Sequence, residues 1–444
     1  MKTCFNLCLA LSSLLPLPLQ ALESNAPLLT LEQAVQVALE HNPDIASARW
    51  NADAAAAAGD TVRARRLPSL KLHGSYDVAS EDQRLFPATA NGEAGVFGSD
   101  LMAADAVLSL PLFTGGRLRS TVSAAELLRQ AAEGGLAYTR ETVVFNVTSL
   151  FYNMLAQREV IRSFESAVSA TAEHRHSIEA QVEAQKAARV DLLRAEVRLA
   201  ELKEKLTRER NTLTIQRWAL AALLGTETGG TAPDVGGDLL PVTMSSCPAA
   251  ADCLRMALAQ RRDYQAALQQ TQAQDESIKA SRAGYFPTLS LQASYGGRWI
   301  GNISDQPAGS DDSQDIGRIG LVAEIPLFEG GAIRAQVREQ TARYHARQEQ
   351  VRKLELLIRT EVEIARAEMA SARERTEATA KAVEQARESF RIIREKYDLG
   401  KGVIVDVLDA QAALVLAETT YARALADLAV SDARRKLATG ELTP

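Results

Sequence analysis

The chain has 444 residues, with 50 lysines and arginines against 56 aspartates and glutamates, and a formal net charge of −6. The negative balance argues against a nucleic-acid partner. His174 and His176 form the only close histidine pair and have no cluster of cysteines or carboxylates beside them, so no metal site is predicted. The sequence contains no phosphate-binding glycine loop, nucleophile elbow or HExxH motif, so we expect neither an enzyme nor a cofactor.

The chain begins with a predicted secretory signal peptide, residues 1–21. This segment has one lysine, an apolar run and small or polar residues near Ala21, and it is too short to cross a membrane as a helix. No later run reaches the roughly 18 apolar residues that suggest a transmembrane helix.

A first structural repeat is predicted over residues 22–225. It opens with one helix over 31–65, which stops before Pro68 because the residue preceding a proline is pushed out of the helical region. The apolar period then changes from 3.6 to 2, which predicts a β-hairpin over about 69–112. Its strands are expected to be about ten residues long, joined by a long exposed loop over 80–100.

Each predicted strand has one apolar and one polar face. The first strand sets Leu70, Leu72, Tyr76 and Val78 against Lys71, His73, Ser75 and Asp77. Aromatic residues stand at the strand ends, with Phe113, Tyr285, Phe286 and Phe328 at one end and Trp299 at the other. This pattern is typical of transmembrane β-strands with a lipid face and a lumen face. The alternative is a soluble sheet of two hairpins packed on a helix.

The hairpin is followed by a very long helix, from Arg117 to about Gln185, and after a short break by a helix over 191–224. In the second half the long helix has apolar residues in steps of three and four, which resembles a coiled-coil seam. Some 70 helical residues give a rod of about 100 Å. The two shorter helices together match the length of the long one, so we expect them to lie end to end along it.

A linker over residues 226–249, rich in Gly, Pro and small residues, joins the two halves near the middle of the rod. Cleavage of the signal peptide would leave Cys247 and Cys253 as the only cysteines. In an oxidising periplasm they can form a local disulfide. Two free thiols are the alternative.

The second structural repeat, residues 250–440, duplicates the first and precedes a short tail, 441–444. The motif PLFTGG at 111–116 recurs as PLFEGG at 326–331, an offset of about 215 residues that continues to the last glycine. The repeat accordingly predicts a helix over 250–284, a hairpin over about 288–327, a long helix over 332–397 and a shorter one over 406–437.

The predicted fold class is an α+β membrane protein. Its duplicated half-repeat gives long coiled α-helical hairpins, which form an α-barrel tunnel, and four transmembrane β-strands per chain. Four strands leave two open edges, and lipid cannot satisfy unpaired backbone groups. Other copies of the chain must therefore close the β-barrel, although strand arithmetic alone does not set their number.

The chain resembles the TolC-like outer-membrane factors over almost all of its mature length. The motifs that carry the resemblance are LTLEQAVQVALEHNPDIASAR, the strand entries LPSLKL and FPTLSL, both PLF motifs, and above all YDLGKGVIVDVLDAQ at 397–411. The resemblance implies a homotrimer with a 12-stranded barrel in the outer membrane of a Gram-negative bacterium and a helical tunnel in the periplasm.

The resemblance also implies a gate where the helices turn back. Asp406 and Asp409 are three residues apart and can share a helix face, so three copies would place six carboxylates at the tunnel mouth. The alternative for this pair is a solvated helix face. Tyr397 resembles a tip tyrosine that holds the closed state, with Asp191 as its partner. For Asp191, helix N-capping is the alternative.

Two features depart from the family pattern. Position 402, where a basic residue is expected, is glycine, which leaves Lys401 or Arg189 to complete the latch. Gly400 resembles a turn glycine used in adaptor docking, but its counterpart in the first half is Gln185.

From these residues we expect a passive, gated duct of a tripartite efflux pump or a type I secretion system. Its partners would be a periplasmic adaptor (membrane fusion) protein and an inner-membrane transporter of the RND or ABC type. One alternative is a periplasmic adaptor or structural coiled-coil component, although membrane-type strands at the rod ends disfavour it. Another is a secreted enzyme or metal-binding protein, against which the absence of a catalytic or ligand cluster counts.

Overall fold

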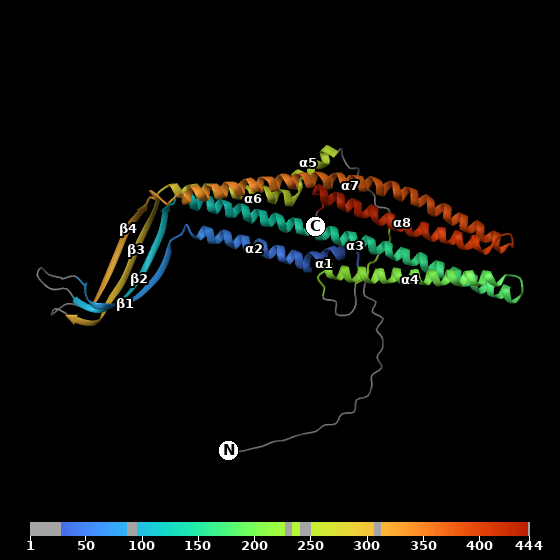
Figure 1. The fold of residues 1–444 in the computed structure, drawn as a ribbon, viewed down its shortest axis with the longest axis horizontal. Helices are drawn as coiled ribbons and strands as arrows, with labels where there is room; N and C mark the ends of the chain where they lie inside the picture. Colours follow the sequence, from blue (N-terminus) through green and yellow to red (C-terminus); the bar gives the residue numbers. More distant parts are fainter. Residues whose placement is uncertain (1–27, 87–95, 227–232, 240–249, 306–311, 443–444) are drawn as a thin grey trace, which may run out of the picture.

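The computed structural model describes residues 28–86, 96–226, 233–239, 250–305 and 312–442. The predicted signal peptide, Cys247 and much of the predicted linker lie outside these residues. Figure 1 shows an elongated molecule with a sheet at one end and long helices extending from it. Among the described helices, none is both long and apolar enough to cross a membrane.

Within the described residues the elements follow the predicted duplicated order. The first half contains α1 (Leu31–His41), α2 (Pro43–Ala64), β1 (Ser69–Phe86), β2 (Val96–Phe113), α3 (Arg117–Glu183) and α4 (Arg189–Leu223). The second contains α5 (Ala250–Gln260), α6 (Arg262–Arg282), the short 3-10 helix η1 (Ala283–Tyr285), β3 (Thr288–Asp305), β4 (Ser313–Glu324), α7 (Ala332–Asp398) and α8 (Ile404–Thr439).

The four described strands form one antiparallel sheet in the order β1-β2-β3-β4. The register pairs Leu70 with Leu108, Leu108 with Ala293, and Ala293 with Ile319. Within the paired ladder the predicted apolar positions therefore share one face, because side chains alternate across a strand with a period of two. The predicted alternation is confirmed there in all four strands, but a register shift interrupts it at Leu112, and Ile325 and Leu327 follow the end of β4.

The strands are longer than the ten residues predicted: β1, β2 and β3 have 18 residues each and β4 has 12. The expected loop over 80–100 was wrong in extent, since β1 continues to Phe86 and β2 begins at Val96. Backbone pairing such as Gln83 with Gly98 continues the ladder where the side chains are polar and no longer alternate.

The apolar face of this sheet is open. Leu72 is 80% exposed and Ile319 is 77% exposed. The sheet extends beyond the ends of the helices, and no helix is drawn across it (Figure 1). The alternative of a soluble sheet packed on a helix is therefore wrong, because no described helix covers this apolar face (Figure 1).

The shorter helices pack along the two long helices, α3 and α7. α3 contacts α2 and α4 in its own half and also α6 and α8 of the other half, while α7 contacts α5, α6 and α8. The apolar seam of α7 is buried in this packing, including Ile358, Val362 and Ala365. The predicted end-to-end arrangement of the shorter helices is confirmed (Figure 1).

The single helices expected over 31–65 and 250–284 are each two helices, and these predictions were wrong. The first breaks at Asn42, whose extended backbone precedes Pro43 and whose side chain caps α2. The Asn42 amide also donates to the Leu223 carbonyl at 2.7 Å, so the end of α4 meets this break. The second breaks at Arg261, next to Gly440 at the end of α8.

Candidate functional site at the far end of the helices

The candidate site is the end of the molecule furthest from the sheet, where α3 turns into α4 and α7 turns into α8 (Figure 1). All four helices contribute to one apolar cluster there. Phe390, Ile393 and Tyr397 of α7 pack against its buried residues, which come from α3, α4 and α8 and are Ile178, Ala195, Ile404, Val407 and Leu408. The two turns are therefore coupled by packing.

Both turns use the same backbone cap. Gln185 and Gly400 adopt left-handed conformations, with φ of 61° and 71°. The next amide then donates back into the helix, from Lys186 to the Gln181 carbonyl at 2.7 Å and from Lys401 to the Lys396 carbonyl at 2.9 Å. This bonding satisfies carbonyls that a helix end leaves unpaired. Glycine adopts the left-handed region without a steric cost, whereas in Gln185 the Cβ atom makes this conformation unfavourable.

The two aspartates that the sequence places at the starts of helices are third residues of those helices. The N-cap residues are Ala188 and Val403, and neither makes a side-chain capping bond. The N-cap alternative for Asp191, and the same role for Asp406, was therefore wrong. Both carboxylates still lie in the first turn, where the partial positive charge of a helix start favours them.

Asp191 lies close enough to Tyr397 to act on it electrostatically. Burial raises the pKa of the Tyr397 hydroxyl above its usual value, and the negative charges of Asp191 and Asp398 raise it further. Tyr397 also packs against the shared apolar cluster. The structure thus brings the predicted tyrosine and aspartate together from different halves of one chain. A carboxyl oxygen of Asp191 also lies 3.8 Å from the guanidinium of Arg194.

Asp406 and Asp409 are both exposed, but only Asp409 lines a groove of about 550 Å³ between α4 and α8. Apolar and charged side chains both line this groove. Its lining residues are Val190, Leu193, Arg194, Val197, Arg198, Glu201, Val405, Leu408, Asp409 and Ala412. Whether the two aspartates line a pore stays a prediction, because it depends on how copies of the chain assemble.

The residues proposed to complete the latch lie at the turns. Arg189 is the first residue of α4, Lys401 follows Gly400, and both are exposed with no ion pair to any other described residue. A Cβ atom at Gly402 would lie 3.3 Å from the backbone nitrogen of Tyr397. A side chain at 402 would therefore press on the last turn of α7, which is a physical reason for glycine here.

Sequence reasoning missed the ion cluster at the second helix break. The Arg261 guanidinium is almost fully buried and donates to the Asp263 carboxylate at 3.0 and 2.8 Å and to Glu361 at 2.5 Å. It also lies over the ring of Tyr138, 5.9 Å from its centroid. The available signal was Pro43, because the residue before a proline is pushed out of the helical region, and the duplication transfers such a break from Asn42 to this position.

The described residues contain no group of three or more His, Cys, Asp or Glu side chains that could hold a metal ion. Cys253 is buried on α5 against Ala257 and Ile358. Because Cys247 lies outside the described residues, the disulfide between the two cysteines stays a prediction.

Comparison with known proteins adds to this geometry. The family model described as "Outer membrane efflux protein" matches residues 34–226 and 253–441. The chain is 22% identical to the outer membrane efflux protein BepC of Brucella suis over 84% of this chain and 77% of that protein. It is 24% identical to the outer membrane protein TolC of Escherichia coli, over 97% and 86% respectively.

Solved structures share the fold. The outer-membrane channel OprN superposes with a TM-score of 0.77 at 22% identity, covering 92% of this chain and 89% of that one. The combination of a four-stranded sheet with long helical hairpins is therefore that of known outer-membrane channels.

Proposed function

Because the chain belongs to the outer membrane efflux protein family, we propose that it is the duct of a tripartite efflux pump or of a type I secretion system. The family resides in the outer membrane of Gram-negative bacteria, and its members are channels rather than enzymes. For this chain we propose a passive conduit with no catalytic residues, which extends into the periplasm and exports solutes to the exterior.

The observation that carries the proposal is the open sheet. Its apolar face is exposed, and the outer edges of β1 and β4 have no partner strand within the described residues. A membrane cannot hold unpaired strand edges, so copies of the chain must supply the missing partners. A homotrimer would give twelve strands, an even number above the eight of the smallest membrane barrels.

The same assembly would gather the far ends of the helices into a tunnel mouth. We propose that Asp406 and Asp409 line its constriction and favour cations there, as carboxylate rings do in pores. Tyr397 and Asp191 would hold the closed state, and the helix ends would splay apart to open it. Arg189, Gly400 and Lys401 would serve the latch or the docking of an adaptor.

A duct of this kind needs partners that supply energy and choose the cargo. We propose a periplasmic adaptor protein and an inner-membrane transporter of the RND or ABC type. The family assignment favours this role over that of a periplasmic adaptor. The sheet favours it as well, because an adaptor would not need an exposed apolar sheet face.

The test is single-channel recording of the purified mature protein in a planar lipid bilayer. The variants are Asp406→Ala/Asp409→Ala and, as a control, Asp60→Asn on α2, whose side chain is 74% exposed. We expect small cation-selective currents that lose selectivity only in the double variant. Currents with unchanged selectivity in the double variant would support the duct but show that the two aspartates belong to a solvated helix face. Folded protein that gives no current would refute the duct.

A further inference from the structure

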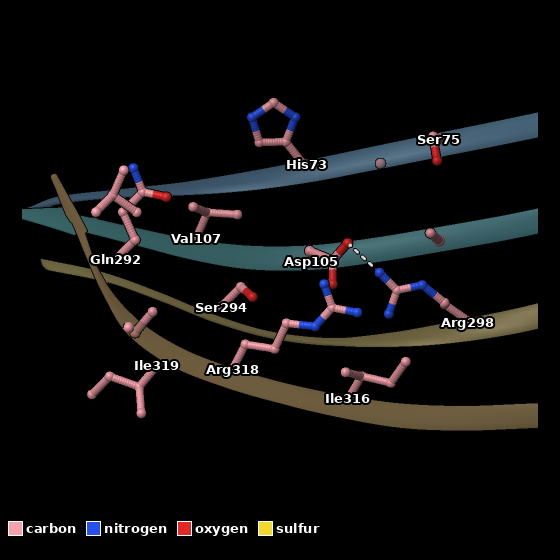
Figure 2. A pocket seen from close by; sticks show the side chains of 15 residues that line it. His73, Ser75, Asp105, Val107, Gln292, Ser294, Arg298, Ile316, Arg318 and Ile319 are labelled. Atoms are coloured by element: carbon pink, nitrogen blue, oxygen red, sulfur yellow. Dashed lines mark ion pairs between the residues drawn. The ribbon is translucent and has the colours of Figure 1, made fainter. Parts of the chain in front are cut away.

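The polar face of the sheet carries a charged cluster with no role in the proposal above. Figure 2 shows His73 of β1, Asp105 of β2, Arg298 of β3 and Arg318 of β4 on this face, in a pocket of about 580 Å³. The register explains the gathering, because His73 pairs with Asp105, Asp105 with Gly296, and Arg318 with Ser294. Arg298, Gly296 and Ser294 are alternate residues of β3, so the cross-strand rows that contain them are neighbours on this face.

The centre of the cluster is a built arrangement. The Arg298 guanidinium lies 3.5 Å from the Asp105 carboxylate, and each side chain is only about a quarter exposed. Gly296 provides the room, because a Cβ atom there would overlap the Asp105 carboxylate. The absence of a side chain at Gly296 thus leaves room for the Asp105 carboxylate beside Arg298.

The cluster has more donors than acceptors. The Nη1 atom of Arg298 is buried and has no hydrogen-bond partner among the described residues. Arg318 points from β4 toward Asp105 (Figure 2), yet it makes no ion pair within the described part of the chain. A buried donor without a partner is costly, so such a group is prepared for an acceptor that the chain itself does not supply.

The net charge of the cluster favours an acceptor that is negatively charged. Lys71 shares a row with Arg318, since Lys71 pairs with Val107 and Val107 with Ser294. Three cations against one carboxylate leave two positive charges per chain in these rows. Asp77 lies one row further from the helices than Arg298, and Glu324 lies at the helix end of the sheet. These two carboxylates therefore lie on either side of the cluster.

We propose that Arg298 and Arg318 form an anion-binding ring in the outer part of the duct, which takes carboxylate- or phosphate-bearing solutes. This inference rests on the proposed function, because closing the sheet with its apolar face toward lipid turns the polar face toward the lumen. Rings of Arg or Lys favour anions in pores. The duct would then have opposite charge preferences at its two ends.

The experiment compares reversal potentials of the mature protein in bilayers under a KCl gradient at low salt, where screening is weakest. Arg298→Gln/Arg318→Gln removes the positive charges, and Arg298→Lys/Arg318→Lys retains them as the matched control. Arg318→Gln alone leaves the Arg298–Asp105 ion pair in place. Asp105→Asn removes the negative charge. Inorganic phosphate added on the barrel side serves as the anion probe.

Coulomb's law in water gives about a twofold change in local anion concentration for each unit charge at about 8 Å. The chloride-to-potassium permeability ratio should therefore fall at least about twofold in the double Gln variant. It should fall less in Arg318→Gln, rise in Asp105→Asn and stay unchanged in the double Lys variant. Phosphate should reduce the wild-type current and lose this effect in the double Gln variant.

The outcomes separate the two ideas. Normal currents with an unchanged ratio in both Gln variants would overturn the anion ring and leave the duct intact. A fall in Asp105→Asn as well as in the Gln variants would also overturn it, because a general loss of structure moves all variants alike. Folded wild-type protein without current would overturn the duct and the ring together.

Discussion

The two turns at the far end of the helices provide a reciprocal experiment. Gln185 and Gly400 occupy the same left-handed position in the two halves, with φ of 61° and 71°. No other atom lies within 4 Å of a Cβ placed at Gly400. Exchange of the two residue types therefore changes backbone strain with little change in packing.

The expected magnitude follows from the cost of the left-handed region. This region costs a residue with a Cβ roughly 1–2 kcal/mol. Glycine avoids that cost, but its greater freedom in the unfolded chain offsets roughly 0.5–1 kcal/mol of the advantage. We therefore expect Gln185→Gly to stabilise the first turn by about 1 kcal/mol and Gly400→Gln to destabilise the second by the same amount.

The assay is hydrogen exchange of the amides that the caps protect, those of Lys186 and Lys401, which donate to Gln181 and Lys396. A change of about 1 kcal/mol is about fivefold in the local opening equilibrium. Exchange at Lys186 should slow about fivefold in Gln185→Gly, and exchange at Lys401 should quicken about fivefold in Gly400→Gln. Gln185→Asn should fall between, since Asn tolerates this region better.

Unchanged exchange at Lys401 in Gly400→Gln, or faster exchange at Lys186 in Gln185→Gly, would refute the reasoning. Either result would mean that the turns are held by packing of the apolar cluster rather than by the backbone caps.

Three further predictions concern stability, measured by thermal unfolding of the assembled protein. Gly225→Ala should cost more than about 2 kcal/mol, because its Cβ would overlap the His41 carbonyl at a φ of 66°, whereas Gly330→Ala meets no atom within 4 Å and should cost less. Burial, and then the charge of Arg394, lower the pKa of His174. The stability of the protein is therefore fully present above about pH 6.5 and is lost as the pH falls below that value. The variant His174→Gln should flatten this pH dependence, and an equally steep profile in the variant would contradict the prediction. Arg261→Met should cost about 1–3 kcal/mol, because it leaves the mostly buried Asp263 without its cation while Glu361 is half exposed. A loss too small to measure would show that water or relaxation compensates the two carboxylates.

Part of the candidate site could be read from the sequence and part could not. The duplication aligned Gly400 with Gln185, and the structure gives both the same backbone cap. The approach of Asp191 to Tyr397 was expected only from the family resemblance, because the two residues lie in different halves and local patterns carry no information on such contacts. The N-cap role failed because Ala188 and Val403 take the extended conformation one turn earlier than the aspartates suggested.

The amino-acid pattern alone predicts the duplicated order of helices and strands, the two long helices and the faces of the strands. These features follow from local periodicity, which depends on the repeat of a helix or a strand and needs no knowledge of neighbours. Apolar residues every second position had to share a face, and the register confirms that they do.

Contacts between segments far apart in the chain set where the strands end, where the first helix of each half breaks and which charges meet. β1 continues through polar residues to Phe86 because backbone hydrogen bonds to β2, rather than side-chain pattern, hold it there. Arg261 lies at the break between α5 and α6, where its guanidinium pairs with Asp263 of α6 and with Glu361 of α7. Asp105 and Arg298 are far apart in the chain and meet through strand register, since long-range pairing alone places such groups side by side.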